Sequence, residues 1–553
     1  MSNKLKIVPL GGAGEIGKNM TIYEYGDEII VVDVGVMFPT EHMLGVDLVL
    51  PDWQYLNDKK ERVKAILFTH GHLDHIGGLP YFLKDGFADV PIYATRLTRG
   101  LIEGSLEEHG LLADAKLSTY QSGDRVRIGQ FEIEPIRVSH SIPDSAALAI
   151  RTPVGTIVQT GDFRFDHTPI DGRTTDMAHL ARLGNEGVLA LLGDSTGIER
   201  ESSTESEAVV SEALDRIFHD ADGRIIIATF ASQLQRVQEI LRIARRHDRV
   251  VAPTGRSMIK NVEIARELGY LSIPPGLLVS LDEAMALPHD KVVLLATGSQ
   301  GEPRAALARM ANGSHRQITL EAGDTVVLSA GPIPGNEESV ARVIDNLFRL
   351  GTNVIYDAIS KVHVSGHGGQ QDIILMQRLL NPRYIIPLHG EFRHLVLHAR
   401  LAQRLGMAAS DIFIVENGQT VLLDERFASV GERVPGGWVF VDGSRVGGTS
   451  SNVLREREAL SQDGFVLVSI AWDAARHQMA NRPRIHSRGF VPQEPNEAMF
   501  NEAADRLTQA LSDATFARED ATAIENRARN VLGKLFYDET RRRPMVVPIV
   551  HMV

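Results

Sequence analysis

The chain has 553 residues, too many for one ordinary hydrophobic core, so its length favours about two to four domains. A net charge of −13 argues against adhesion to nucleic acid over the whole surface, and the absence of cysteine excludes disulfides and thiolate metal ligands. No apolar run approaches the roughly 18 residues of a membrane span, and the N-terminus is too short in apolar residues for a secretory signal. We therefore expect a cytoplasmic protein that does not contact membranes.

The first motif is the glycine-rich stretch at residues 12–17, which fits the G-x-G-x-x-G pattern of dinucleotide-binding proteins. Asp33 ends an apolar run about where such proteins carry a ribose-binding acid. That fold needs a helix directly after the glycines. Residues 21–25 are instead β-branched and aromatic, Gly26-Asp27 favours a turn, and residues 29–32 form a second strand-like run. We predict a β-hairpin here and no nucleotide-binding fold.

The later elements predict several domains. Residues 1–205 contain short strands that run into polar clusters. Strands and helices alternate regularly over residues 206–355, which predicts a parallel sheet covered on both faces. Residues 356–425 return to strand ends with histidines and are expected to complete the first domain. Residues 426–455, rich in glycine, valine and serine, are predicted to be a linker with short strands, and residues 456–553 a small α+β domain with two amphipathic helices.

Metal-ligand residue types are densest in THGHLDHIGG, residues 69–78. This loop follows the apolar strand at residues 65–68 and holds four candidate ligands: His70, His72, Asp74 and His75. Four such groups would be costly to bury without a cation, and imidazole with carboxylate suits zinc, manganese or iron. A lone histidine is more often an ordinary hydrogen-bonding residue, but the four together predict a metal site.

The sequence HGHLDH resembles the signature of the metallo-β-lactamase superfamily. This resemblance implies further ligands at later strand ends, for which the candidates are His140 in RVSHS, Asp162 in QTGDF and His389 in YIIPLHGE. The inserted residues 206–355, together with Asp194 in GDST and His367 in HVSGHGG, resemble the β-CASP group of nucleases. The motif PLGGAGEIGKNM and the C-terminal domain also resemble those of bacterial ribonuclease J. The resemblance to that family covers nearly the full chain.

The resemblance implies an α/β protein: a metallo-β-lactamase αββα sandwich with an inserted β-CASP parallel-sheet domain and a small C-terminal α+β domain. It also implies two divalent metal ions in each subunit, for which zinc is the first expectation and manganese the alternative. One ion would be held by His70, His72, His140 and Asp162, and the other by Asp74, His75, Asp162 and His389. Asp162 would thus lie between the two ions, with room for a bridging water.

The implied reaction is hydrolysis of RNA phosphodiesters to 5′-phosphate products by water activated between the two metals. Asp74, Asp194 and His367 are the expected catalytic residues. His367 would stabilise charge on the phosphate oxygens, and Asp194 would fix the tautomer of a ligand histidine.

Two further groups of residues are expected to contact RNA. The turn formed by His363, Ser365 and Gly366 with His367 would hold a 5′-monophosphate, which accounts for 5′→3′ trimming beside endonucleolytic cleavage. Ser232 and Arg236, at the start of a helix, would contact the RNA backbone. The alternative for Ser232 is helix capping alone.

The implied partners are single-stranded, 5′-monophosphorylated RNA and other copies of the chain, as a homodimer or homotetramer. The implied roles are RNA processing and the maturation and decay of mRNA and rRNA, with RNA-degradation or ribosome-associated proteins as possible partners. Three alternatives remain open: a DNA-directed β-CASP nuclease, a metallo-β-lactamase-fold hydrolase that is not a nuclease, and an RNA-binding scaffold with structural metals.

Overall fold

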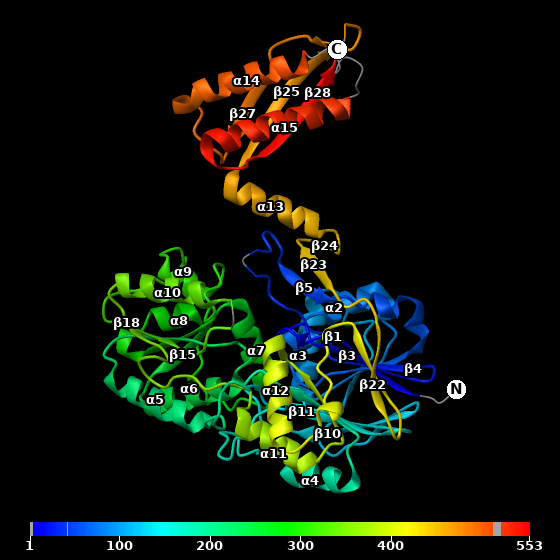
Figure 1. Cartoon of the computed structure of the whole chain (residues 1–553). Helices are drawn as coiled ribbons and strands as arrows, with labels where there is room; N and C mark the ends of the chain where they lie inside the picture. Colours follow the sequence, from blue (N-terminus) through cyan, green and yellow to red (C-terminus); the bar gives the residue numbers. More distant parts are fainter. Residues whose placement is uncertain (1–3, 41, 334, 477, 513–520) are drawn as a thin grey trace. The chain divides into compact units, whose positions relative to one another are not determined.

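The computed structural model describes residues 4–40, 42–333, 335–476, 478–512 and 521–553 (Figure 1). The chain forms two compact units, one of Met1–Phe38 with Leu48–Val439 and one of Pro39–Asp47 with Phe440–Val553. Among the described residues, no helix has both the length and the apolar character needed to cross a bilayer.

Two sheets packed face to face form the centre of the larger unit. The first sheet has eight strands in the order β22-β21-β1-β3-β4-β6-β7-β8. These are β1 (Leu5–Gly11), β3 (Met20–Tyr25), β4 (Glu28–Val32), β6 (Val63–Leu67), β7 (Ile92–Ala94), β8 (Leu117–Thr119), β21 (Gln419–Leu423) and β22 (Ala428–Arg433). Strands β3 and β4 pair antiparallel, so the predicted hairpin is confirmed and no helix follows the glycines. Edge strand β22 comes from the stretch that we predicted to be a linker with short strands.

The second sheet has six strands in the order β19-β13-β12-β11-β10-β9. These are β9 (Val126–Ile128), β10 (Phe131–Arg137), β11 (Ala146–Thr152), β12 (Gly155–Gln159), β13 (Ala190–Asp194) and β19 (Tyr384–Leu388). Strands β9 to β12 pair antiparallel, whereas β12, β13 and β19 run parallel to one another. The last strand therefore joins the sheet from the far side of the inserted residues.

Helices complete a four-layer sandwich around these sheets. Alternate strand residues such as Ile30, Leu67 and Ile150 fill the core between the sheets. Helices α4 (Met177–Glu186), α11 (Gln370–Leu380) and α12 (Phe392–Arg404) cover the outer face of the second sheet. Helix α3 (Arg96–Glu108) packs on β7 and β8 of the first sheet. The predicted αββα sandwich is confirmed.

The inserted residues form a five-stranded parallel sheet in the order β15-β16-β14-β17-β18. Its strands are β14 (Ile225–Ala228), β15 (Val250–Thr254), β16 (Val292–Ala296), β17 (Thr325–Leu328) and β18 (Asn353–Ile355). Its helices are α5 (Glu207–Asp220), α6 (Leu234–Arg246), α7 (Arg256–Glu267), α8 (Leu281–Met285), α9 (Ala306–Ala311) and α10 (Glu337–Arg349). Helices lie on both faces, with α8 to α10 packed on one of them, so the predicted α/β architecture is confirmed (Figure 1).

The smaller unit is an α+β structure with its own core. Strand β25 (Phe465–Asp473) pairs antiparallel with β27 (Arg484–Arg488) and parallel with β28 (Met545–Met552). Helices α14 (Glu497–Leu511) and α15 (Ala521–Thr540) cover one face of this sheet (Figure 1). Its other elements are β24 (Arg445–Val446), α13 (Ser451–Asp463) and β26 (Gln478–Met479), and β23 (Trp438–Asp442) begins in the larger unit and continues into this one.

Candidate metal centre

Polar side chains follow the carboxyl ends of strands from both sheets of the sandwich. The loop at residues 69–75 follows β6, and Asp162, Asp194 and His389 lie at or just after the ends of β12, β13 and β19. Because β12, β13 and β19 are parallel neighbours, their carboxyl ends meet at one edge of the sheet. Residues far apart in the sequence therefore converge on the loop that follows β6.

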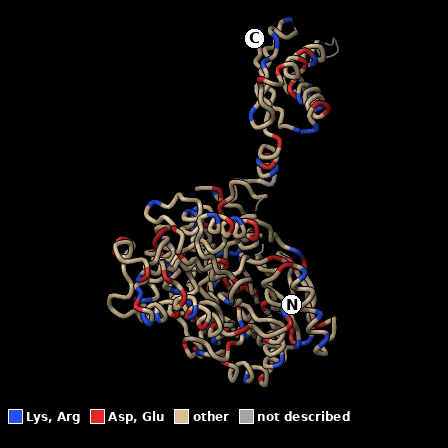
Figure 2. The backbone as a smooth tube through the Cα atoms, turned by 90° about the vertical axis from the view of Figure 1, so that its left-hand side faces the viewer, with Lys and Arg blue, Asp and Glu red and all other residues tan. Residues whose placement is uncertain are grey.

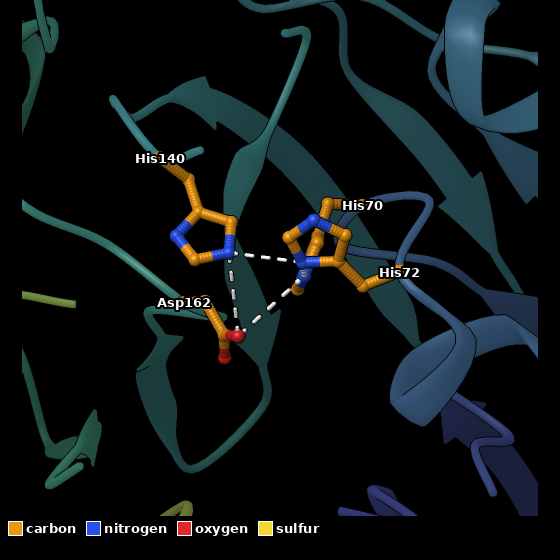
Figure 3. Close-up of side chains that lie close together, drawn as sticks. All are labelled: His70, His72, His140 and Asp162. Carbon is orange, nitrogen blue, oxygen red and sulfur yellow. Dashed lines mark hydrogen bonds and ion pairs between the residues drawn. The ribbon is translucent and has the colours of Figure 1, made fainter. Parts of the chain in front are cut away.

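Three imidazoles and one carboxylate form the first ligand cluster (Figure 3). His72 Nδ1 lies 3.0 Å from His70 Nε2 and 3.1 Å from His140 Nε2. The Nε2 atoms of His70 and His140 are each 3.5 Å from Asp162 Oδ2. Two ligands of a tetrahedral zinc ion are about 3.4 Å apart, given bonds of about 2.0–2.1 Å, so these four donor atoms fit around one such cation.

Asp74, His75 and His389 form a second cluster with the same aspartate. His75 Nε2 lies 3.5 Å from Asp74 Oδ2 and 3.3 Å from Asp162 Oδ1. Asp74 Oδ2 is also 3.2 Å from His389 Nε2. All seven predicted ligands are thus brought together, and Asp162 presents one oxygen to each cluster.

Asp162 is the residue whose environment most directly suits a cation. Its side chain is 2% exposed, and its Oδ1 accepts no hydrogen bond from the described residues. Burying a carboxylate oxygen without a hydrogen bond costs free energy, because the oxygen loses its hydrogen bonds to water and gains no donor in the protein. A divalent cation between Oδ1 and the surrounding ligand atoms would satisfy it, so the donor set fits metal ions.

The ring nitrogens that face away from the clusters have partners of their own. His140 Nδ1 donates to the carbonyl of Gly366 at 2.8 Å, and His389 Nδ1 lies 2.8 Å from Thr196 Oγ1. Thr196 Oγ1 also donates to the His389 carbonyl, so it accepts from the ring. Contacts of this kind fix both the tautomer and the ring orientation of a ligand histidine, leaving the other nitrogen free to bind metal.

Asp33 is a member of this site that the sequence analysis missed. It is 1% exposed, adopts φ +61°, and lies with Oδ2 2.8 Å from His75 Nδ1. It also accepts from the backbone and the hydroxyl of Thr69, each at 2.9 Å. Its position could have indicated this role, because Asp33 directly follows β4, the parallel neighbour of β6. The ligand loop follows the carboxyl end of β6. Asp33 therefore holds His75 and binds no ribose.

The two clusters differ in electrostatic character. Burial lowers the pKa of His70 and His140 and brings that of His72 to about 4, so these imidazoles are neutral near pH 7 and free to bind metal. Burial also lowers the pKa of His389, but the carboxylate of Asp162 and its acidic neighbours raise it overall to about 10. The second cluster thus requires positive charge, which either a proton or a bound cation supplies.

The glycine-rich stretch near the N-terminus supports the last ligand. The backbone N–H of His389 donates to the Gly12 carbonyl at 2.6 Å. Strand β2 (Ala13–Gly14) pairs with β20 (Gly390–Glu391) directly after it. A Cβ atom on Gly12, which has φ +78°, would lie 2.2 Å from Asn19 Oδ1. The glycines therefore allow close packing beside the ligand loop.

His367 lies at the open side of the clusters. Its side chain is 20% exposed, its Nδ1 is 2.8 Å from Asp194 Oδ2, and its Nε2 is 3.9 Å from Asp162 Oδ2. Burial alone would raise the pKa of Asp194, but His367 holds it below the usual range. Asp194 is also 3.4 Å from Nδ1 of the candidate ligand His389. It therefore orients His367 closely and His389 more loosely.

The turn formed by His363, Ser365 and Gly366 adjoins the first cluster through His140. The amides of Ser365 and Gly366 donate to no other described residue, and Ser365 Oγ accepts from the His367 amide at 3.2 Å. Burial, with a smaller effect from the Arg236 guanidinium, lowers the pKa of His363 to about 3. The turn thus offers free backbone donors beside a neutral imidazole.

Arg236 and Ser232 lie differently from the prediction. The Arg236 side chain is 1% exposed and donates to both oxygens of Glu207, with Nη2 at 2.8 and 3.0 Å. It reaches His363 Nδ1 at 3.3 Å and is not available to an RNA backbone. Ser232 does not cap α6, whose N-cap is Gln233, without a side-chain hydrogen bond. The predicted direct contact of Arg236 with RNA is therefore replaced by an interior ion pair.

Four protein-family models together match most of the chain. Residues 13–196 match the metallo-beta-lactamase superfamily, residues 222–347 the ribonuclease J beta-CASP domain, residues 353–415 the Zn-dependent metallo-hydrolase RNA specificity domain, and residues 452–553 the ribonuclease J C-terminal domain. A crystal structure of a protein of unknown function from Enterococcus faecalis V583 covers 76% of this chain and 100% of its own, with a TM-score of 0.54 and 17% identity. At that identity it supports the fold alone.

The sandwich, the inserted parallel sheet and the paired ligand clusters define a metallohydrolase of the metallo-β-lactamase superfamily that carries a β-CASP domain. Ribonuclease J from Synechocystis sp. is 43% identical over 98% of this chain and 86% of its own, and that from Thermus thermophilus 42% over 99% and 95%. Ribonuclease J2 from Bacillus subtilis is 39% identical over 99% of both chains. The chain belongs to the ribonuclease J family.

Proposed function

We propose that the chain is a metal-dependent ribonuclease that hydrolyses phosphodiesters of single-stranded RNA to products with 5′-phosphates. It acts as a 5′→3′ exonuclease that prefers 5′-monophosphorylated ends, and it also cleaves internally, in the processing and decay of RNA. The observation that supports this most strongly is the position of Asp162, which shares its two oxygens between two four-residue clusters.

The two clusters hold two divalent cations in this proposal, zinc first and manganese as the alternative. When bound, such a pair supplies Lewis acidity and lowers the pKa of an attacking water toward neutrality. The chain's own residues orient the reaction. Asp33, Gly366 and Thr196 hold the ligand rings of His75, His140 and His389 in place.

His367 acts on the reacting phosphate. Asp194 accepts from its Nδ1, so Nε2 is directed toward the clusters. From there it donates a hydrogen bond to a non-bridging phosphate oxygen, where negative charge increases in the transition state. Asp74 Oδ2 lies between His75 Nε2 and His389 Nε2, so Asp74 would complete the second cluster as a metal ligand.

The turn at residues 363–366 accounts for the preference for 5′-monophosphate ends. The free amides of Ser365 and Gly366 form a small anion-binding nest of the kind that suits a phosphate. The Gly366 carbonyl binds His140, so this nest lies directly beside the first cluster. A terminal phosphate held there places a nearby phosphodiester at the metals, which favours stepwise removal of nucleotides from the 5′ end.

The test is hydrolysis of matched oligomers by the purified full chain. A 5′-monophosphorylated RNA is compared with the same RNA carrying a 5′-hydroxyl and with a DNA of the same sequence, each with metal and with chelator. We expect 5′-mononucleotides from the phosphorylated RNA, slower release from the hydroxyl form, and none with chelator. Equal rates on DNA would support the DNA-directed alternative, and intact RNA despite bound metal would support the scaffold alternative.

The number and kind of metal are tested by elemental analysis of the same sample. We expect two equivalents of zinc or manganese per chain, and about one in an Asp162→Asn variant, because a single amide oxygen cannot replace a shared carboxylate. Retention of two equivalents in the variant would contradict the sharing of Asp162.

We further propose that the chain self-associates as a dimer or tetramer through the smaller unit. On β25 the buried residues Val466, Val468 and Ile470 alternate with half-buried ones, which include the apolar Phe465 and Leu467 on the opposite face. Ile549 of β28 is 40% exposed. A second copy of this chain would cover this apolar face.

Light scattering tests the self-association. The unmodified chain should have at least twice the mass of a single chain, and Leu467→Arg should reduce it, whereas Arg476→Ala, at a side chain 76% exposed, should not. An unchanged mass for the Leu467 variant would place the interface elsewhere.

A further inference from the structure

The inserted domain contains a cavity that the proposed reaction does not use. Its volume is about 670 Å³, and it lies beyond the carboxyl ends of β15 and β16, beside the start of α7. A cavity of this size, at the carboxyl edge of a parallel sheet, is in the range and position typical of small-ligand sites in α/β domains. Thr254 and Thr297, the residues at these strand ends, contribute to its wall.

The cavity is lined by cationic groups without partners. Arg256, Arg304 and Arg309 all contribute to its wall, and none of their guanidinium groups donates to an acceptor among the described residues. The one acidic residue in the wall is Glu263, and His315 is the remaining titratable group. Basic and acidic residues are interspersed along the chain, which carries a net charge of −13 (Figure 2). Three guanidinium groups without an acceptor among the described residues, gathered around one cavity, favour an anionic ligand.

The backbone adds donors to the same cavity. Helix α7 is 12 residues long, and its N-cap, Gly255, provides no side chain to bond the first amides. Gly255 has φ +96°, and a Cβ atom there would lie 2.4 Å from Thr297 Oγ1, so glycine is needed for this close approach. The uncapped amides and the helix dipole favour a phosphate at the point where Arg256 begins the helix.

Contacts lead from the cavity toward the turn at residue 363 and toward helix α3 of the sandwich. The loop after β16 runs from Thr297 to Gln300, whose Nε2 donates to the Gly331 carbonyl at 2.9 Å, and Gly331 packs against His363. Helix α7 also packs on α3, where Lys260 donates to the Gly104 carbonyl. The cavity thus lies on the edge of the inserted sheet that also faces the turn at residue 363.

We propose that this cavity is a second phosphate site, which binds the phosphate and sugar of one nucleotide through Arg256, Arg304 and Arg309. This site is separate from the metal clusters and does not depend on the proposed hydrolysis. The phosphate and sugar bound here could belong to a free nucleoside 5′-monophosphate or to one nucleotide of an RNA strand. The experiment below distinguishes these two ligands.

The experiment compares the full chain with an Arg256→Gln/Arg309→Gln double variant. The control is Arg342→Gln, which removes a charge from the same domain at a side chain 66% exposed. Calorimetric titration with adenosine 5′-monophosphate measures the free nucleotide. Titration with a single-stranded RNA over a range of salt concentrations, in an Asp74→Ala background to prevent cleavage, measures the RNA strand. Folding of each variant is checked by its melting temperature.

If the ligand is a free nucleotide, the unmodified chain binds one equivalent that the double variant loses or binds at least tenfold more weakly, whatever binds at the metal clusters. If the ligand is part of an RNA strand, RNA affinity falls, and the slope of log K against log salt decreases by about 0.7 for each phosphate that the variant no longer neutralises. The proposal is overturned if the double variant, folded normally, matches Arg342→Gln in both titrations.

Discussion

The metal-ligand cluster and the turn at residues 363–367 adjoin each other, yet different parts of the chain hold them in place. The ligand rings are fixed mainly by residues of the sandwich, such as Asp33 and Thr196. The turn is held from two sides. Arg164 of the sandwich donates to the Ser365 carbonyl at 3.0 Å, whereas Arg236 of the inserted domain contacts His363.

This difference separates two aspects of the activity. All the candidate metal ligands lie on elements of the sandwich, so in the proposed function the sandwich supplies the groups that cleave a phosphodiester. The inserted domain takes part in positioning the turn, because Ser329 after β17 donates to the Val362 carbonyl at 2.7 Å and accepts from Arg236. Changes to the ligand cluster should therefore reduce all cleavage, and changes to the turn should alter the choice of RNA end.

The largest effect is expected from Asp74→Ala or His75→Ala. Each removes a group of the second cluster, and loss of a metal-dependent contribution of several kcal/mol should lower hydrolysis by about 10³-fold or more. RNA binding should persist, as measured by filter binding beside single-turnover rates. The control is Asp89→Ala, a fully exposed surface carboxylate. Normal turnover in either variant would show that this loop does not carry the reaction.

A smaller loss is expected from Asp33→Asn. Asparagine tolerates the positive φ at this position, so the fold should persist while the charged partner of His75 is removed. Changes of this kind typically cost about 10- to 100-fold in activity or metal affinity. Rates measured at limiting and at saturating metal concentration distinguish a loss of metal affinity from a loss of activity. The control is Asp27→Asn, which removes a carboxylate from the same hairpin. Unchanged rates and metal affinity would assign Asp33 a purely structural role.

The turn is tested by Ser365→Leu, with Ser365→Ala as the control of small volume. The leucine should fill the space beside the free amides and reduce the preference for 5′-monophosphorylated RNA about tenfold, the equivalent of one hydrogen bond to a charged group. Internal cleavage should change less, as measured by product sizing on RNAs with blocked 5′ ends. Equal loss of both activities would argue against a phosphate site in the turn.

The smallest change in activity is expected from Arg236→Lys. Lysine keeps the charge but cannot bond both oxygens of Glu207 and reach His363 as well. We expect a loss of about 2 kcal/mol in stability and a reduced 5′-end preference with internal cleavage retained. Thermal melting and end preference are compared with Arg242→Lys on the same helix, whose side chain is 51% exposed. If the preference for 5′-monophosphorylated ends is unaltered, the ion pair between Arg236 and Glu207 does not position the turn.

Much of the fold and the ligand set was predictable from the sequence because both depend on local pattern. Alternation of strands and helices predicted the parallel sheet of the inserted domain, and the β-branched run at residues 21–25 excluded a nucleotide fold. The ligands of the loop at residues 70–75 lie close together in the sequence. The later candidate ligands follow strands, whose ends are recognisable from apolar runs, but it was the resemblance to the metallo-β-lactamase superfamily that selected them.

Only the tertiary structure decided which groups surround those ligands. Asp33 and Gly366 contact ligand histidines from segments 42 and 226 residues away, and no spacing rule connects them. Helical periodicity places Arg236 on one face of α6, but it does not tell whether that face meets solvent or the carboxylate of Glu207 on α5. Ligand types are a property of local sequence, whereas burial and pairing arise from contacts between distant segments.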